Sequence, residues 1–307
     1  MTKFFENMMF APCWYHYIFI VLLMPFSLFY GLVMYLRRVL SVKKDFGIPI
    51  ISVGNLIVGG AGKTPFVIEL ASKYDDVTII SRGYGRQSKG LVEVSQKGNI
   101  LTSVKESGDE AMLMAISLPF ASVIVCEDRE KAILHAKQNG TKLIILDDGF
   151  NRVKIQKFEI LLEPLVVKNY LPFPAGAFRE FWFMKRYADM CLKEGKDFLR
   201  EVNYENLSSK MLLVTAIANP HRLDMYLPEN IVGKIYLEDH AYFNERELKK
   251  LLSEYKAKSI LVTEKDEVKM TGFKLPLSKM RLKLDINKDI FIQIDQYLNQ
   301  YKKDSTL

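Results

Sequence analysis

Cysteine, tryptophan and histidine are scarce in this chain of 307 residues, which has three, two and four of them. The cysteines, Cys13, Cys126 and Cys191, lie far apart and form no CxxC pair. A disulfide framework and a structural zinc site are therefore not expected, and a reducing compartment fits best. The chain also lacks internal repeats and low-complexity tracts.

The remaining composition is that of a globular protein, with 49% hydrophobic and 26% charged residues, which argues against disorder. Lys and Arg outnumber Asp and Glu by 43 to 36, a net charge of +7. This excess suits nucleic acid, an anionic membrane surface or a phosphorylated substrate, and does not choose among them. The length leaves room for two α/β domains.

One segment, residues 14–36, is apolar and aromatic and carries no formal charge if its histidine is neutral. As a helix rising 1.5 Å per residue it could cross a hydrocarbon core of roughly 30 Å. Arg37, Arg38, Lys43 and Lys44 follow, so the positive-inside rule places the downstream chain in the cytoplasm. The run is too long for a signal peptide, and no small-residue cleavage site follows it.

Three interpretations of this segment stay open. Pro25, Ser27 and Gly31 weaken the spanning interpretation, because a kinked helix can lie in the interface instead. The aromatic side chains suit the headgroup level of a membrane. The third interpretation is an amphipathic helix docked on the protein's own core. We expect membrane contact, whereas the choice between spanning and lying on the surface is left open.

Strands and helices alternate in the chain that follows. The patterns predict strands at residues 48–54, 77–80, 121–126 and 142–146, and helices at 63–71, 109–118 and 129–138. This alternation is typical of a mainly parallel sheet covered on both faces. A second, smaller α/β unit follows, with strands at residues 211–216, 234–237, 259–263 and 281–284 and helices at 245–255 and 291–301.

We therefore predict three parts. Residues 1–45 form a membrane-associated helix with its basic flank, residues 46–204 a P-loop nucleotide-binding domain, and residues 205–307 a smaller α/β domain. The cleft between the two domains is the default site.

A glycine-rich turn joins the first predicted strand to its helix and reads Gly59-Gly60-Ala61-Gly62-Lys63-Thr64. This arrangement presents backbone N–H groups to a polyphosphate, while the lysine meets its terminal phosphates and the threonine can ligate Mg²⁺. Pro65 suits a first helical turn, and Asn55 opens the loop. The strict pattern needs a glycine where Ile57 stands, so an ordinary strand–helix turn is the alternative.

Other polar residues are candidates only beside this loop. Asp147 and Asp148 end an apolar strand, where P-loop proteins carry a Mg²⁺-binding acid, although such a pair also ends many strands. Asp109 and Glu110 follow Gly108, and an N-cap with a first-turn acid explains them equally well. The remaining candidates are ordinary surface residues unless they act on phosphate or substrate, namely His240, Arg82, Arg86 and Arg179.

Taken in order, these segments resemble the tetraacyldisaccharide 4′-kinase family, which phosphorylates a lipid A precursor. The resemblance spans nearly the whole chain and rests on the apolar helix, Ser52-Val-Gly-Asn-Leu56, the glycine-rich loop to Pro65, Ser81-Arg-Gly-Tyr-Gly85, Gly108-Asp-Glu110, Asp147-Asp-Gly-Phe150, Pro174-Ala-Gly-Ala-Phe-Arg-Glu180, Asp239-His240 and Thr263-Glu-Lys-Asp266.

The resemblance implies a P-loop NTPase-type fold, ATP and Mg²⁺ as cofactors, and γ-phosphate transfer to the 4′-hydroxyl of an acylated glucosamine disaccharide 1-phosphate. It implies that Asp109 is the base, His240 its partner and Arg179 the group that steadies the phosphate. Asn55 and residues 59–65 would bind the nucleotide, and the metal would lie near Thr64, Asp147, Asp148, Glu110 and Glu180. The expected location is the cytoplasmic face of a bacterial inner membrane, with no nucleic-acid partner and no obligate protein partner.

The chain departs from the family pattern at Ala111, at Ala177-Phe178 and at Asn151-Arg152, which puts acyl-chain or sugar recognition in doubt more than the reaction. Two other hypotheses remain. A soluble P-loop NTPase acting as a switch or metallochaperone would hydrolyse nucleotide without lipid. A nucleotide-binding partner without catalysis would function without Asp109.

Overall fold

The computed structural model describes residues 2–59, 62–164 and 167–304. Its chain forms two compact units, each assembled from separate stretches of sequence. Unit 1 comprises residues up to 67, 133–199 and the chain from 286 onward, and unit 2 comprises 68–132 and 200–285. The predicted Gly60 and Ala61 of the glycine-rich loop lie outside the described residues.

Unit 1 is built on a parallel sheet whose central strand carries the glycine-rich loop. In pairing order its strands are β6 (Leu143–Asp147), β1 (Ile50–Gly54), β7 (Phe158–Glu163) and β8 (Met190–Lys193). Every residue of β1 and of β6 is buried, as expected for strands covered on both faces. Parallel pairing brings the carboxyl ends of these strands to one edge of the sheet, where α/β proteins bind ligands.

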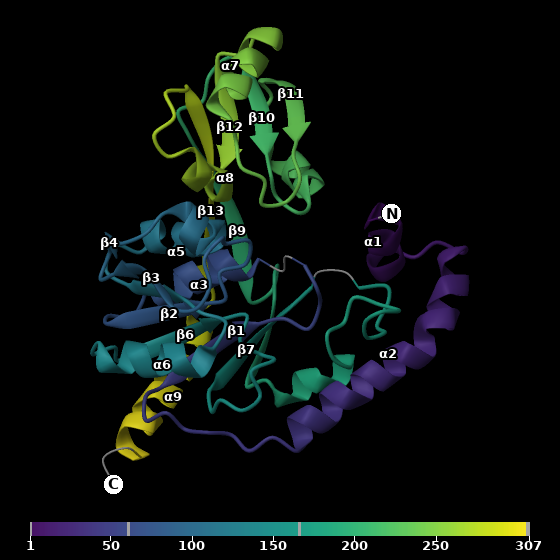
Figure 1. Cartoon of the computed structure of the whole chain (residues 1–307), viewed down its shortest axis with the longest axis vertical. Helices are drawn as coiled ribbons and strands as arrows, with labels where there is room; N and C mark the ends of the chain where they lie inside the picture. Colours follow the sequence, from purple (N-terminus) through teal and green to yellow (C-terminus); the bar gives the residue numbers. More distant parts are fainter. Residues whose placement is uncertain (1, 60–61, 165–166, 305–307) are drawn as a thin grey trace. The chain divides into compact units, whose positions relative to one another are not determined.

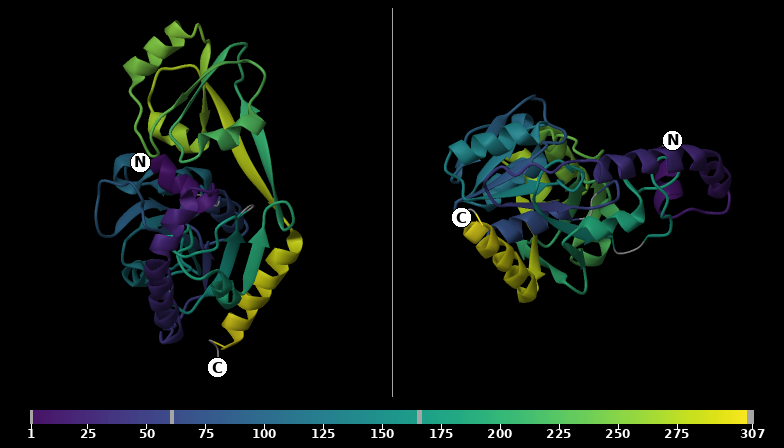
Figure 2. Two further views of the ribbon diagram at one scale, coloured as in Figure 1. Left: turned by 90° about the vertical axis from the view of Figure 1, so that its right-hand side faces the viewer. Right: turned by 90° about the horizontal axis from the view of Figure 1, so that it is seen from below.

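The helices of unit 1 include α3 (Lys63–Ala71), the 3₁₀ helix η1 (Trp182–Tyr187) and the C-terminal α9 (Lys288–Asp304), with α6 (Arg129–Gln138) starting in unit 2. We expected the last helix in the second domain, but its Tyr297 hydroxyl donates to the carbonyl of Ile50 and accepts from the amide of that residue. Figure 2 shows α9 in yellow, ending at the C-terminus. An amphipathic pattern reveals an apolar face but not the sheet that this face covers.

Two N-terminal helices complete unit 1, and a tight turn joins α1 (Thr2–Phe10) to the long α2 (His16–Val39), as Figure 1 shows. One side of α2 lies against its own unit, where Ile20 packs with Met8 and Ala175, and the Ser27 hydroxyl donates to the carbonyl of Pro172. Most of the helix is exposed: 17% of its most apolar stretch is buried. Among the described residues, α2 is the helix long and apolar enough to cross a membrane.

Unit 2 contains two groups of strands. In the first, β2 (Val77–Ser81) pairs in parallel with β5 (Ser122–Val125), which pairs antiparallel with β3 (Val92–Gln96), and β4 (Asn99–Ile100) pairs with β3. The helices α4 (Val104–Ser107) and α5 (Asp109–Ser117) accompany them.

The second sheet of unit 2 has the order β11 (Ile231–Tyr236), β10 (Met211–Thr215), β12 (Ser259–Thr263), β13 (Leu277–Ile286) and β9 (Phe198–Glu205), parallel from β11 to β13. The helices α7 (Glu245–Glu254) and α8 (Glu264–Glu267) belong to it, with the 3₁₀ segments η2 (Pro220–Tyr226) and η3 (Val268–Met270).

The predicted class, an α/β fold with mostly parallel sheets, is confirmed. The helices predicted at residues 63–71 and 129–138 and the strand predicted at 259–263 have the same bounds in the structure, and the other predicted helices and strands are present with shifted ends. The domain boundaries at residues 46 and 205 stay predictions.

Candidate active site

The glycine-rich loop begins where β1 approaches the turn after β6. A Cβ atom added at Gly54 would lie 2.6 Å from the Cβ of Phe150, so only glycine lets the two backbones come so close. The loop ends at Gly62, whose φ of +72° side chains rarely adopt, and α3 begins at Lys63. The N-terminus of α3 therefore points its free N–H groups toward the loop, as anion binding requires.

Four side chains from separate segments of unit 1 meet beside this loop. The ammonium of Lys63 donates to Oδ1 of Asn55 at 3.1 Å and lies 3.6 Å from Oδ1 of Asp148. Both oxygens of Asp148 accept from Nη1 of Arg179, at 2.9 and 2.7 Å. The structure thus brings together four of the residues that the sequence predicted for the nucleotide, the metal and the transferring phosphate.

Asp148 is held in an uncommon backbone conformation, with φ of +54°, directly after β6. Burial alone would raise the pKa of this carboxyl, but the charges of Lys63 and Arg179 outweigh it and hold the pKa below its ordinary value. Asp148 is therefore ionised at neutral pH, the state that a cation ligand requires.

The loop fits a Mg²⁺–nucleotide complex. Among the described residues there is no cluster of three or more His, Cys, Asp or Glu side chains that could hold a metal by itself. Mg²⁺ commonly needs only one or two carboxylates, because water and substrate phosphates supply its other ligands. The Nδ2 of Asn55 is buried and has no hydrogen-bond partner among the described residues, so it can donate a hydrogen bond to a phosphate oxygen. The assignment of Thr64 and Asp148 as metal ligands stays a prediction.

Two further acids of the predicted metal set are already in ion pairs. Both oxygens of Glu180 accept from Arg38, and Glu110 lies 3.2 Å from the ammonium of Lys265. Asp147 is buried at the end of β6. The roles of these three residues toward a metal stay predictions.

The second group of candidates lies in unit 2, where α5 starts at Asp109. The Nδ1 of His240 lies 2.9 and 3.0 Å from the two oxygens of Asp109, which makes a carboxylate–imidazole pair from residues 131 positions apart. His240 has a positive φ of +61°, and its ring lies 5.1 Å from that of Tyr84. Such strain at a non-glycine residue is typical of functional sites.

Two lysines flank this pair, and reasoning from sequence gave them no role. The ammonium groups of Lys265 and Lys269 lie 3.9 and 3.6 Å from Oδ2 of Asp109. Asp266 is fully buried, lies 3.1 Å from the Lys269 ammonium and accepts from the hydroxyls of Thr215 and Thr263. The motif Thr263-Glu-Lys-Asp266 thus supplies one of the two lysines and the buried acid that holds the other.

The electrostatics of Asp109 follow from these neighbours. Burial would raise its pKa, but the hydrogen bond from His240 and the charges of Lys265 and Lys269 outweigh burial, so the pKa lies below its ordinary value. Asp109 is ionised at neutral pH and can accept a hydrogen bond from a substrate hydroxyl.

The other two candidate arginines belong to unit 2 and are not part of this pair. Arg86 is ion-paired with Glu127 at 2.6 Å and donates to the carbonyl of Gly90, so it holds its own loop together. Arg82 is exposed.

Comparison with known proteins identifies the family. Residues 19–299 match the family model for tetraacyldisaccharide-1-P 4′-kinase. The chain is similar to a tetraacyldisaccharide 4′-kinase of Helicobacter pylori strain J99, with 49% identity over 91% of this chain and 89% of the relative, and to one of Aliarcobacter butzleri, with 45% identity over 97% of both. It also resembles the crystal structure of LpxK from Aquifex aeolicus in complex with ATP, with a TM-score of 0.77, 28% identity, and coverage of 91% of this chain and 98% of that one. The chain therefore belongs to the tetraacyldisaccharide 4′-kinase family.

Proposed function

We propose that this protein transfers the γ-phosphate of ATP to the 4′-hydroxyl of a tetraacylated glucosamine disaccharide 1-phosphate, a step of lipid A biosynthesis. The observation that carries the proposal is the pair of Asp109 and His240. A nucleotide-binding loop alone supports any P-loop protein, whereas an ionised carboxylate held by an imidazole offers a base for an alcohol acceptor.

The nucleotide side of the reaction needs positioning and charge neutralisation more than covalent chemistry. Lys63 and the backbone N–H groups at the start of α3 would bind the β- and γ-phosphates, and Arg179 would neutralise charge on the phosphoryl group during transfer. Thr64 and Asp148 would hold Mg²⁺. When bound, this ion supplies further neutralisation of phosphate charge.

On the acceptor side, Asp109 would orient the 4′-hydroxyl and accept its proton. A new bond forms between the hydroxyl oxygen and the γ-phosphorus, the bond to the bridging oxygen breaks, and ADP leaves. Because the pKa of Asp109 is low, proton transfer should come late, after bond formation has acidified the hydroxyl. His240 would keep the carboxylate in its orientation through Nδ1.

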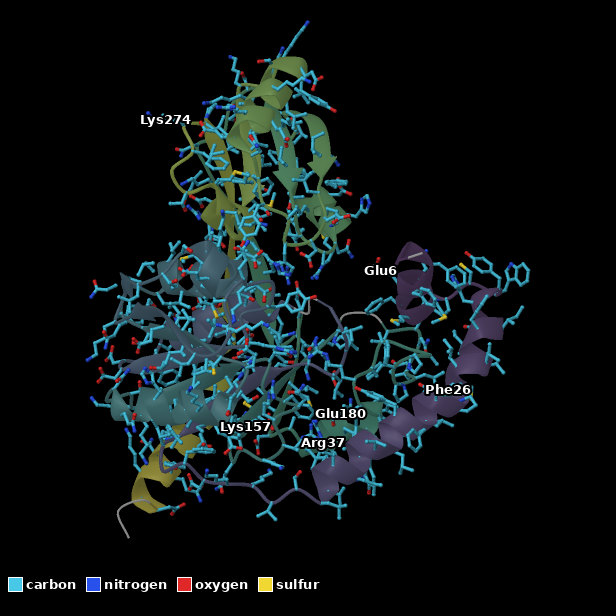
Figure 3. The ribbon with its side chains drawn as sticks, viewed as in Figure 1. Glu6, Phe26, Arg37, Lys157, Glu180 and Lys274 are labelled. Carbon is cyan, nitrogen blue, oxygen red and sulfur yellow. The ribbon has the colours of Figure 1, made fainter. Side chains whose placement is uncertain are left out.

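The long helix α2 supports a lipid acceptor. Its exposed side chains are mostly apolar, and Arg37 and Arg38 stand in its last turn. We propose that α2 associates with the cytoplasmic face of the bacterial inner membrane, with the exposed Arg37 at the phosphate level. Figure 3 labels Phe26, midway along α2, and Arg37 near its C-terminal end.

The test is phosphorylation of the purified disaccharide lipid in detergent micelles with radiolabelled ATP and Mg²⁺. The wild-type protein should give a 4′-phosphorylated product, and Asp109→Asn should lose about 10²–10⁴-fold in kcat, as expected for removal of a general base. Asp224→Asn, which changes an exposed carboxylate of the same unit, is the matched control and should retain activity. Rapid ATP hydrolysis without lipid, together with no lipid product, would instead identify a soluble NTPase.

A further inference from the structure

Arg38, in the last turn of α2, has an unusually buried guanidinium. Its Nε and Nη2 donate to the two oxygens of Glu180, at 2.9 and 2.8 Å, and both side chains are almost inaccessible, with 7% and 3% of their surface exposed. Nη2 also donates to the carbonyl of Phe150 at 2.9 Å, and the guanidinium stacks 4.1 Å over the Phe150 ring. This is the two-point geometry in which arginine binds a carboxylate most strongly.

The two partners of Arg38 come from the two segments that carry the phosphate-site ion pair. Glu180 directly follows Arg179, and Phe150 stands two residues after Asp148, the acid that Arg179 binds. The amide of Arg179 donates in turn to the carbonyl of Leu56 in the loop after β1, at 2.7 Å. The side chain of Arg38 therefore fixes both segments. Because the segment that contains Glu180 also contains Arg179, this contact extends to Leu56 at the start of the nucleotide loop.

A buried ion pair that joins two segments adds little net stability, because the cost of desolvation offsets most of the electrostatic attraction. Apolar residues of similar size often stabilise a protein equally well. What the pair provides is a fixed geometry, since a guanidinium that bridges a carboxylate and a carbonyl holds both at set distances. We propose that Arg38 is a positioning residue that couples the placement of α2 to the geometry of Asp148 and Arg179. The proposal rests on the phosphotransfer function proposed above.

The neighbouring Arg37 offers a matched control within the same turn. It carries the same charge at the same end of α2, but it is exposed, and its guanidinium donates to the carbonyl of Asn151 at 2.7 Å. Figure 3 labels Arg37 and Glu180 near the C-terminal end of α2. If the basic residues serve only to attract anionic lipid, removal of either arginine should have the same effect.

The experiment compares Arg38→Gln, Arg38→Lys and Arg37→Gln in the full chain. Four quantities are measured: kcat for lipid phosphorylation at saturating ATP and lipid in micelles, the Kd for a fluorescent ATP analogue, binding to phosphatidylglycerol vesicles, and Tm. We expect Arg38→Gln to lower kcat by about 10- to 100-fold and to weaken nucleotide binding by about tenfold, because the Arg179 segment loses its anchor and Glu180 keeps an uncompensated charge. Arg37→Gln should match the wild type in both, and a loss of vesicle binding should be confined to Arg37→Gln, because Arg37 is the exposed arginine of the two.

Arg38→Lys distinguishes a positioning role of Arg38 from an effect of its charge alone. This variant also keeps the experiment decisive if Arg38→Gln does not fold. Lysine restores the charge but not the two-point geometry, so kcat should recover only in part while Tm approaches that of the wild type. Equal kcat and nucleotide affinity for Arg38→Gln and Arg37→Gln, or full recovery of both by Arg38→Lys, would overturn the coupling. If the wild type made no lipid product, the proposed function would fail, and the nucleotide Kd values would still decide the role of Arg38.

Discussion

Phe26 and Phe29 on the outer side of α2 allow a quantitative test of membrane association. Their side chains are 66% and 69% exposed, so about two thirds of a phenylalanine surface of roughly 200 Å² can be buried in lipid. At about 25 cal/mol per Å² this contributes approximately 3 kcal/mol per residue, of which alanine retains about a third. Phe26→Ala should therefore weaken membrane partitioning by approximately 2 kcal/mol, or about 30-fold.

The assay is sedimentation of purified protein with vesicles of phosphatidylethanolamine and phosphatidylglycerol at several lipid concentrations. The double variant Phe26→Ala/Phe29→Ala should lose about 10³-fold, because the two burials add when the helix stays in place. Met225→Ala is the control, since this residue is 81% exposed but belongs to η2 of unit 2 and not to α2. Partitioning that is unchanged by the double variant, or reduced equally by the control, would refute the reasoning that α2 is the membrane-binding element.

Three other substitutions test the two sites. Lys265→Met removes a charge 3.9 Å from Asp109. The attraction between this charge and the carboxylate amounts to about 4 kcal/mol at an effective dielectric constant of about 20, and to roughly a third of that after solvent screening. The low pKa of Asp109 should then rise, so the acid limb of the kcat/KM profile moves to higher pH, while Lys265→Arg restores it; a uniform loss at every pH would contradict this. Gly54→Ala forces a Cβ against Phe150 and should cost about 1–3 kcal/mol, seen as a lower Tm and weaker ATP binding. Lys269→Met leaves buried carboxylates without their cation and should cost about 3–5 kcal/mol in urea unfolding, an expectation that an unchanged midpoint would disprove.

Local patterns were sufficient to predict most of the fold. Strand, glycine-rich turn and helix were predictable around Lys63 because each signal lies within a few residues of the next. The strands β3, β4, β7, β8 and β9 were not predicted. In β9 most residues are polar or exposed, and the apolar periodicity is weak. The contact between α9 and β1 depends on which sheet the apolar face of the helix covers. No local sequence signal indicates which sheet that is.

The same distinction applies to the candidate site. Asp148 and Lys63 were predictable as neighbours because both follow strands whose carboxyl ends meet at one edge. The contact of Arg38 with Glu180 joins residues 142 positions apart, and nothing near either residue marks it as buried. In the sequence, Lys269 likewise cannot be distinguished from a surface lysine. The packing of η3 brings it close to Asp109.

The hydrogen bonds between Tyr297 and Ile50 have a consequence for biosynthesis. The strand that precedes the nucleotide loop emerges early from the ribosome. Its residue Ile50 has no hydrogen bond to Tyr297 until that residue has been synthesised, 247 positions later. Unit 1 is completed only after unit 2 has been synthesised, because its segment from residue 286 onward follows unit 2 in the sequence. A nascent chain must therefore hold the loop strand without α9 while unit 2 is synthesised. Premature termination shortly before α9 should then yield a chain with an intact set of candidate catalytic residues and an incomplete nucleotide-binding unit.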